Sequence, residues 1–282
     1  MSKIKLVTDS TCDLSSALIE KHAIDVVPLY VNINEASYKD GVEITPTALY
    51  RMVEEEGVLP TTAAASSETF KDVFKRYLDQ GYAILYVGIG SGFSSTLQSA
   101  HIAKNELGSD KIHLVDSMNL SSGSGLLLLK AARFREDGLS AAEIKEKLEA
   151  IVPKVRTQFV INTLEYLHKG GRLKAISAFM GTMLRIKPII VVKDGAMAVG
   201  KKPRGHIRAG VKLLLKDAFK HIDEIDPEFI MITHTEAQKQ ADYIRRELES
   251  TNHFKHIHET EAGCVISSHC GPGTIGILYI MK

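Results

Sequence analysis

Hydroxyl side chains gather in three glycine-bearing loops, each directly after a predicted strand. The loops read TDSTCDLSS (8–16), GIGSGFSSTLQSA (88–100) and VDSMNLSSGSG (115–125), and helix-like sequence follows the last two. A loop that opens a helix presents unpaired backbone N–H groups at the positive end of the helix dipole, which suits a phosphate or a carboxylate. Serine and threonine add donors without charge. We therefore expect the loops to converge on one anionic group.

Three further segments carry polar groups that suit the same chemistry. PTTAAASS (60–67) is another hydroxyl-rich helix entrance, although alone it is typical of an ordinary N-cap. In HKGGRL (168–173) two glycines permit a tight turn before Arg172, whose guanidinium fits a carboxylate or phosphate, or which simply follows a helix end. KKPRGHIR (201–208), with Arg204, is either a solvated loop or a patch for a phosphate or an acidic partner.

His269 stands before Gly-Pro-Gly in AGCVISSHCGPGTIG (262–276). This rigid turn can hold an imidazole at the edge of a cleft, and the alternative is a structural histidine. His269 with Cys264 and Cys270 lacks the CxxC or HxxxH spacing of a zinc half-site, so we expect no metal.

Familiar catalytic and nucleotide motifs are missing from the hydroxyl loops. GIGSGFSS departs from GxGxxG at its third glycine, which disfavours dinucleotide binding, and the chain has no GKS or GKT. Ser94 follows Gly92 but precedes Thr96, so it is not in a nucleophile elbow, and a geometric triad is the remaining route to a hydrolase. A structural turn remains the alternative for this loop. We assign no catalytic residue and expect no cofactor.

Length, charge and cysteine content favour a cytoplasmic protein of two α/β domains. The 282 residues suit two domains of roughly 140 each. A net charge of +1 gives no general signal for nucleic acid or membrane, and three cysteines form an odd set typical of a reducing compartment. The sequence has neither a signal-peptide h-region nor an apolar run of the ~20 residues that span a bilayer.

Apolar strands alternate with capped helices, which predicts an α/β fold. The first domain, 1–156, is expected to hold a parallel sheet and the second, 157–282, a mixed sheet, because the DG at 194–195 predicts a hairpin. Expected helices include 45–57, 67–81, 140–151, 206–221 and 236–250. Expected strands are 3–8, 26–33, 82–89, 112–116, 157–162, 187–193, 196–200, 228–234, 256–261 and 274–281.

Eight segments in order over almost the whole chain resemble the DegV family, the fatty acid-binding subunits of bacterial fatty acid kinase. They are TDSTCDL, YKDGVEI, PTTAAASSETF, GIGSGFSSTLQSA, VDSMNLSSGSG, VINTLEYLHKGGR, IKPIIVVKDG and GCVISSHCGPGTIG. The resemblance implies two α/β domains with a long-chain fatty acid between them. It also implies a separate kinase subunit that phosphorylates the carboxylate, and acyl phosphate acceptor enzymes of phospholipid synthesis downstream.

The resemblance also implies roles for particular residues. Thr62 and Ser94 would bind the carboxylate with Ser95 contributing its amide, while Arg172, Arg204 and His269 would lie near the head group or face the kinase. Ala63 and Cys270 depart from the hydroxyls that relatives commonly carry there. Aliphatic residues that could line a tunnel are Leu126 to Leu129, Phe179, Met180, Met183, Leu184 and Ile186.

Two other classes of function remain as alternatives. A phosphoryl- or acyl-transfer enzyme could use the same hydroxyl loops, although the chain shows no P-loop or nucleophile elbow. A DNA-binding regulator using KKPRGHIR is disfavoured by the near-zero net charge. We expect a non-catalytic lipid-binding subunit.

Overall fold

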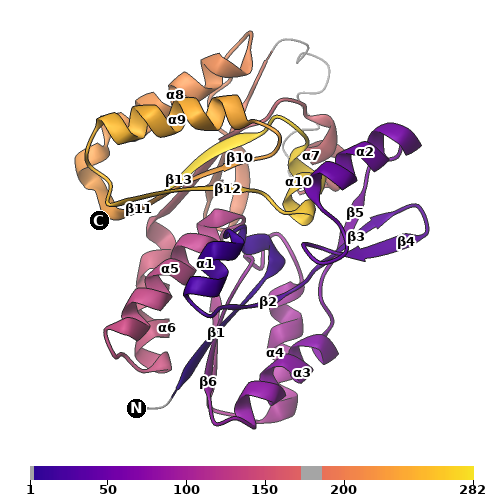
Figure 1. Ribbon diagram of the computed structural model, residues 1–282, viewed down its shortest axis with the longest axis vertical. Helices are drawn as coiled ribbons and strands as arrows, with labels where there is room; N and C mark the ends of the chain where they lie inside the picture. Colours follow the sequence, from indigo (N-terminus) through magenta and orange to yellow (C-terminus); the bar gives the residue numbers. More distant parts are fainter. Residues whose placement is uncertain (1–2, 173–185) are drawn as a thin grey trace.

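The computed structural model describes residues 3–172 and 186–282, which form an α/β fold with two main sheets (Figure 1). The first sheet is wholly parallel, in the order β2-β1-β6-β7. Its strands are β1 (Ile4–Asp9), β2 (Asp25–Val27), β6 (Ala83–Gly88) and β7 (Ile112–Asp116). The predicted parallel sheet of the first domain is thereby confirmed.

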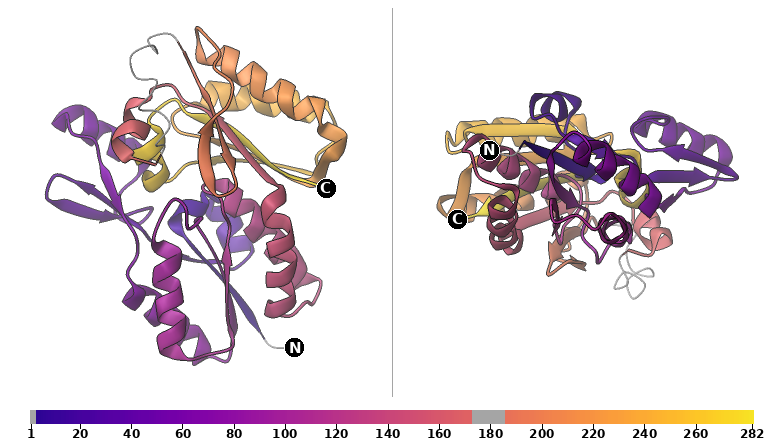
Figure 2. Two further views of the ribbon diagram at one scale, coloured as in Figure 1. Left: turned by 180° about the vertical axis from the view of Figure 1, so that it is seen from behind. Right: turned by 90° about the horizontal axis from the view of Figure 1, so that it is seen from below.

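Helices cover both faces of this sheet, and residues alternate between them as the strand period requires (Figure 2). Leu85 and Val87 pack towards α5 (Ser122–Glu136) and α6 (Ala141–Ile151). Ile84 and Tyr86 pack towards α3 (Ser67–Leu78) and α4 (Thr96–Leu107). Burial on both faces explains why these strands are continuous apolar runs. Short elements nearby are η1 (Ser10–Cys12), α1 (Ser16–Lys21) and η2 (Val152–Lys154).

The second sheet is mixed, with the order β10-β9-β8-β13-β11-β12. Its described neighbours are antiparallel except for β11 and β12, which are parallel. Asp194 and Gly195 have positive φ in the turn between β9 and β10, so the DG hairpin is confirmed. The strands are β8 (Val155–Val160), β9 (Ile189–Lys193), β10 (Ala196–Val199), β11 (Ile225–His234), β12 (His256–Glu261) and β13 (Ile275–Met281).

Two long helices cover one face of the mixed sheet, and shorter elements complete this half of the chain (Figure 1). The long helices are α8 (Ile207–Lys220) and α9 (Gln238–Ser250), with η4 (Ile222–Glu224) after α8. The short helices α7 (Glu165–Gly170) and α10 (Cys264–Cys270) pack against each other. Because β8 opens the mixed sheet at Val155, we retain the division into 1–156 and 157–282 as a proposal.

A small antiparallel sheet forms a third unit that sequence reasoning did not predict. It contains β4 (Ala36–Lys39), β3 (Tyr30–Ile33) and β5 (Thr61–Ala63), and α2 (Pro46–Glu56) belongs to the same stretch of chain. We call residues 28–66 the arm, because they project beside the main body (Figure 1). The single strand predicted at 26–33 is wrong: Pro28 separates β2 from β3, which pair in different sheets.

Several helix starts follow the predicted capping chemistry. Thr45 Oγ1 accepts the Ala48 N–H at 3.3 Å, with Pro46 at the first helical position of α2. Ser140 and Glu143 form a complete capping box at the start of α6. The described residues contain no helix that is long and apolar enough to cross a membrane.

Buried polar contacts connect the parallel-sheet half of the chain with the mixed sheet. The Thr157 hydroxyl donates to Asn119 Oδ1 at 2.7 Å, and the Ser122 and Thr233 hydroxyls are also paired. These neutral pairs lie in the interior, where each hydroxyl needs a partner. The two halves therefore meet through a specific polar interface.

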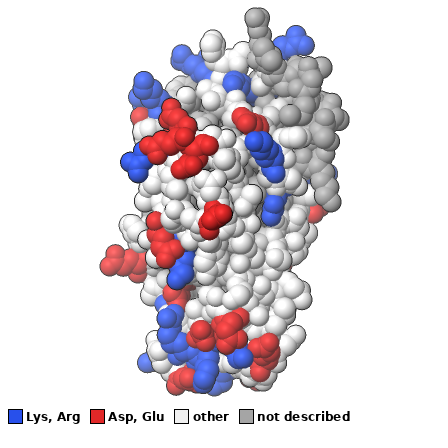
Figure 3. All heavy atoms as spheres, turned by 90° about the vertical axis from the view of Figure 1, so that its right-hand side faces the viewer, with Lys and Arg blue, Asp and Glu red and all other residues white. Residues whose placement is uncertain are grey.

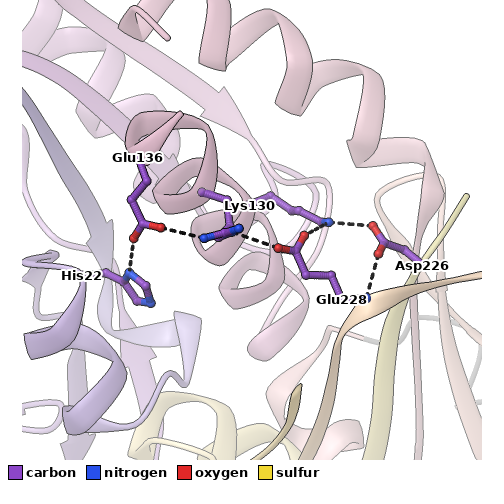
Figure 4. Close-up of polar contacts among 6 residues, drawn as sticks. His22, Lys130, Glu136, Asp226 and Glu228 are labelled. Atoms are coloured by element: carbon purple, nitrogen blue, oxygen red, sulfur yellow. Dashed lines mark hydrogen bonds and ion pairs between the residues drawn. The ribbon is translucent and has the colours of Figure 1, made fainter. Parts of the chain in front are cut away.

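In contrast to these neutral pairs, a network of ion pairs lies at the edge of the interface (Figure 4). Lys130 on α5 pairs with Asp226 at 2.6 Å and with Glu228, both at the start of β11, and its side chain is only 10% exposed. Arg133 on α5 reaches Glu228 at 3.0 Å. The network thus joins the helix that covers the first sheet to a strand of the second.

Candidate functional site

A cavity of about 270 Å³ lies where the arm, the loop after β6 and helices α7 and α10 meet. One set of lining residues is polar: Thr62, Ser94, Ser95, Arg172 and His269. The other walls are largely aliphatic and aromatic, with Leu29, Ile89, Phe93, Leu120, Leu167, Met197, Val265 and Ile266. Mostly apolar walls with a few placed polar groups are typical of a site for a small organic ligand. The separation into polar and apolar groups favours an amphipathic one.

Thr62 and His269 meet across the cavity wall. Thr62 is on β5 of the arm, and its Oγ1 lies 2.9 Å from Nε2 of His269 near the end of α10. The contact joins residues separated by 207 positions. The predicted carboxylate ligand and the predicted motif histidine therefore share one hydrogen bond.

His269 is neutral in this environment. Burial of the imidazole, together with the positive charge of Arg172, lowers the pKa of His269 to about 4. Its Nδ1 is buried and has no hydrogen-bond partner among the residues that the structure describes. An unpaired lone pair is better tolerated in the interior than an unpaired N–H, so we assign the proton to Nε2, which donates to Thr62 Oγ1. The Thr62 hydroxyl proton is then free to point at a ligand.

Ser94 and Ser95 end the loop that connects β6 to α4. Ser94 Oγ lies 2.8 Å from Thr96 Oγ1 and accepts the Thr96 N–H at 3.2 Å. Ser95 is the N-cap of α4, and its side chain makes no capping hydrogen bond. The loop is close to β9 and β10, because a Cβ on Gly92 would overlap the Gly195 carbonyl. Two hydroxyls and the positive end of a helix dipole therefore face the cavity.

Arg172 adds one positive charge to this group of hydroxyls. It follows the left-handed Gly171 that ends α7, and its Nη1 donates to the Gly170 carbonyl at 2.7 Å. Gly170 itself packs under the imidazole, because a Cβ there would overlap Nδ1 of His269. The turn after α7 therefore positions the guanidinium and the histidine together.

Arg204 does not line this cavity. It is exposed and pairs with Ile186 in an isolated bridge. The cavity brings together the other five predicted site residues. The test of each role is by mutation.

The expected convergence of three hydroxyl loops is wrong in detail. In the first loop the Thr11 hydroxyl donates to Asp9, and Asp13 accepts from Ser121 of the third loop. Polar groups in the first and third loops thus bond to each other inside the protein. Of the three loops, the one at 88–95 places hydroxyls in the cavity lining among the described residues. Leu120 is the contribution of the third loop.

The apolar lining residues were missed by sequence reasoning. The sequence around Phe93 and Leu167 does not show whether they line a cavity or lie in the core, because wall and core residues have the same periodicity and composition. Leu126 to Leu129, suggested for a tunnel, are instead fully buried in the core. The suggested Phe179, Met180, Met183 and Leu184 lie outside the described residues.

A second, smaller cavity of about 30 Å³ adjoins the first and shares Leu120, Ile266 and Cys270 with it. It is bordered by Thr157, Thr233, Thr235 and Thr274, whose hydroxyls all bond to protein atoms. Threonines with satisfied hydroxyls can contribute methyl groups to an apolar wall. The smaller cavity therefore extends the first cavity with a largely apolar wall.

Ala63 and Cys270, the two positions where the resemblance implies hydroxyls in relatives, both lie in the cavity wall. Burial, with a smaller contribution from Asp13, raises the pKa of the Cys270 thiol to about 12. The thiol is therefore uncharged and acts as a small apolar group.

Comparison with known proteins identifies relatives that match the whole chain. The family model described as "Uncharacterised protein, DegV family" matches residues 3–282. A DegV domain-containing protein of Clostridium acetobutylicum is 40% identical over 283 residues and covers all of both chains. Another, from Caldanaerobacter subterraneus, is 36% identical and also covers all of both chains.

Solved structures agree over the same span. A DegV family protein from Thermus thermophilus, described as fatty acid-binding, superposes with a TM-score of 0.92 at 32% identity, covering 99% of this chain and all of that one. A stearic acid-binding protein from Eubacterium ventriosum gives a TM-score of 0.87 at 30% identity, covering 100% and 99%. With the family model matching nearly every residue, the chain belongs to the DegV family.

Proposed function

We propose that this protein binds a long-chain fatty acid and presents its carboxylate to a separate kinase subunit for conversion to an acyl phosphate. The observation that carries the proposal is the cavity itself, with Thr62, Ser94, Ser95, Arg172 and His269 grouped beside aliphatic walls. The fatty acid-binding relatives from Thermus thermophilus and Eubacterium ventriosum support the ligand class. We propose that the protein itself is not catalytic.

Hydroxyl donors hold the carboxylate, and hydrogen bonds from neighbouring residues orient these hydroxyls. His269 Nε2 donates to Thr62 Oγ1, so the Thr62 O–H donates outward to one carboxylate oxygen. In the same way Thr96 supports Ser94, whose O–H donates to the other oxygen. Hydrogen bonds to a charged acceptor are stronger than neutral ones, and the N-terminus of α4 favours the negative charge.

The apolar walls supply the affinity for the acyl chain. Each methylene group removed from water contributes about 0.8 kcal/mol. Because burial of a carboxylate and immobilisation of a flexible chain both cost free energy, a long chain is needed to offset them. A long-chain fatty acid satisfies this condition, whereas a short-chain acid or an inorganic anion does not.

Arg204 and the basic segment around it form the proposed kinase-facing surface. Arg204 is exposed and outside the cavity lining, so it is free to contact an acidic surface of a partner. The kinase supplies the nucleotide and the phosphoryl group, while this chain holds the attacking carboxylate. The acyl phosphate then passes to acceptor enzymes of phospholipid synthesis.

We place the protein in the cytoplasm, where its three free buried cysteines remain reduced. Nucleic acid is not a proposed partner. The face of the molecule next to α2 shows positive and negative side chains in small mixed groups, some near its middle, and a broad uncharged area, without a basic stripe (Figure 3).

Mass spectrometry of an organic extract of the purified protein tests the ligand. We expect a long-chain fatty acid in near-stoichiometric amount, and we expect added fatty acid to raise the melting temperature of the delipidated protein. If no fatty acid is detected and only a nucleotide or sugar phosphate raises the melting temperature, the ligand assignment is wrong.

Acyl phosphate formation tests the division of labour. Arg204→Ala should retain fatty acid affinity but lose product when ATP, Mg²⁺ and a cognate kinase subunit are supplied. His269→Ala should weaken fatty acid binding as well, because it supports Thr62. Acyl phosphate made from ATP and fatty acid by this chain alone would instead favour the alternative of a transfer enzyme.

A further inference from the structure

Helix α10 is held at its start by two carboxyl groups from the other half of the chain. The Gly263 N–H donates to Asp13 Oδ1 at 2.8 Å, and the Cys264 N–H donates to Asp40 Oδ1 at 2.7 Å. Asp13 follows η1, and Asp40 follows β4 of the arm. These contacts span 250 and 224 residues, and the one from Cys264 to Asp40 is made only when the arm and α10 lie together.

The other end of the same helix carries the head-group site. His269 is one residue from the end of α10 and contacts Thr62 of the arm. The Tyr50 hydroxyl on α2 also donates to the Ser267 carbonyl of α10, at 3.4 Å. Thr62 and α10 form walls of one cavity, so the contacts that Asp13 and Asp40 make hold the helix that carries one of these walls.

The two carboxyl groups are close together and buried. Asp13 is 5% and Asp40 is 3% exposed. Both approach Gly263 so closely that the place where a Cβ would stand is 3.2 Å from each Asp40 oxygen and 3.3 Å from Asp13 Oδ1. Within the described part of the chain, Asp40 Oδ2 has no hydrogen-bond partner. Two ionised carboxylates in this space would repel each other, and an unpartnered oxygen is where a proton can reside.

The neighbouring titratable groups do not neutralise this pair. Burial raises the pKa of Asp13 well above its ordinary value, and the charges of Asp40 and Asp9 raise it further against hydrogen bonds that oppose the shift. Burial likewise raises the pKa of Asp40. On α10 itself the nearby groups are the Cys264 and Cys270 thiols, whose pKa values burial also raises. His269 at the far end is neutral.

We propose that Asp13 and Asp40 are positioning residues that share one proton when the arm and α10 close around a fatty acid, so that closure of the head-group cavity takes up a proton. This inference rests on the proposed function, because it concerns how the same site is regulated. The proton allows both carboxyl groups to accept the N–H groups of α10 without mutual repulsion.

The sign of the pH dependence follows from this arrangement. In an open form the solvated carboxyl groups titrate near their ordinary pKa of about 4. The closed form retains one proton to higher pH, because its carboxyl pKa values are raised. The pair alone therefore makes fatty acid affinity fall as the pH rises from about 4 through the raised pKa. His269 acts in the opposite direction below its ordinary pKa, because burial in the closed form lowers its pKa to about 4, so the difference between wild type and Asp40→Asn isolates the pair.

Isothermal titration calorimetry of delipidated protein in buffers of different ionisation enthalpy measures proton uptake directly. With oleate as the probe between pH 5 and 8, we expect uptake of up to one proton by wild type and a loss of up to about tenfold in affinity per pH unit within the window. Asp40→Asn keeps an acceptor for Cys264, and it should lose this uptake and the associated slope. Ionisation of the oleate contributes equally to both proteins.

Asp13→Asn should reproduce the effect of Asp40→Asn. Asp79→Asn, which changes an exposed carboxylate paired with Lys75, is the matched control and should behave as wild type. If Asp40→Asn and wild type take up equal numbers of protons, the shared-proton inference is wrong while the ligand assignment stands. If wild type binds no oleate at any pH, the proposed function itself fails.

Hydrogen–deuterium exchange on wild type gives a second measurement if the variants do not fold. The amides of Gly263 and Cys264 are the donors to the two carboxyl groups. After correction for the intrinsic pH dependence of exchange, their protection in the ligand-free protein should fall from pH 5 to pH 8. Constant protection over this range overturns the inference.

Discussion

At the scale of single residues, the site binds an anion mainly with groups that have no charge of their own. A hydroxyl whose oxygen already accepts a hydrogen bond has fewer directions left for its proton. Thr62 is oriented in this way by His269, and Ser94 accepts from the Thr96 amide. The donors are therefore arranged before the ligand arrives, which lowers the ordering cost of binding.

Replacing Thr62 with valine tests this arrangement. Thr62→Val keeps the shape of the side chain but removes the hydroxyl, so fatty acid binding should weaken by about 1–3 kcal/mol. Thr62→Ser retains the hydroxyl and is the matched control, with a smaller loss. Competition with a fluorescent fatty acid gives both affinities, and equal binding by valine and serine variants would place the carboxylate elsewhere.

The neutrality of His269 has a consequence for pH. Its pKa is lowered to about 4, so the folded site binds fewer protons there than the unfolded chain does between that value and the ordinary value. The contribution of His269 to stability is therefore lost in acid as the pH falls below its ordinary pKa. From pH 7 upward this residue contributes no pH dependence.

At the scale of elements, α7 and α10 act together as the platform for the histidine. The two helices pack on each other, and Gly170 leaves the space that the imidazole fills. Gly171 has a different task, since its φ of +68° ends α7 and a Cβ there would meet nothing within 4 Å. Two adjacent glycines thus answer to two separate requirements, one of space and one of backbone conformation.

Alanine at each glycine should separate these requirements. Gly170→Ala should displace His269 from Thr62 and weaken fatty acid binding about tenfold or more, since the added methyl overlaps Nδ1. Gly171→Ala should leave binding nearly unchanged but cost about 1 kcal/mol of stability through the left-handed backbone. Chemical denaturation and ligand titration of both variants measure the two effects. The reverse pattern would contradict this account of the turn.

Elements with strong periodicity or caps were predictable from the sequence, and those determined by packing were not. The strand at 112–116 and the capped helix at 140–151 match β7 and α6 closely. The small sheet of the arm was missed because β4 and β5 are only four and three residues long and largely exposed. In such strands pairing between distant segments, not local pattern, decides the structure.

The candidate site shows the same division. The resemblance to the DegV family pointed to Thr62, Ser94 and Arg172, which the cavity brings together. Asp13 and Asp40 gave no signal, since an aspartate after a strand or turn is common and its burial depends on a helix more than 200 residues away. Apolar wall residues are likewise indistinguishable from core residues in sequence.

At the scale of the whole molecule, the two halves are joined by polar contacts as well as apolar ones. Among these contacts, Lys130 depends on its partners because its ammonium group is largely buried between Asp226 and Glu228 (Figure 4). Burial alone would raise the pKa of Asp226, but hydrogen bonds from Lys130 and the Glu228 amide lower it overall. This contribution to stability is present at neutral pH and is lost as the pH falls through the lowered pKa.

Lys130→Met should therefore destabilise the protein by about 1–3 kcal/mol at pH 7, because two partly buried carboxylates lose their shared partner. The matched control is Lys145→Met, which removes an exposed pair with Glu149 and should cost at most about 0.5 kcal/mol. Urea denaturation at pH 7 measures both losses. A cost for Lys130→Met no larger than that of the control would show that the network is dispensable.

The position of β13 in the mixed sheet has a consequence for synthesis. This strand comes last among the described elements, yet it lies between β8 and β11. A nascent chain that has emerged only to residue 274 has β8–β9–β10 and β11–β12 as two separate ribbons, each with an open apolar edge. Such edges invite pairing with other chains, so chaperone protection is needed until β13 has been made. A ribosome stalled just before β13 would therefore release an aggregation-prone chain, not a slightly shortened binding protein.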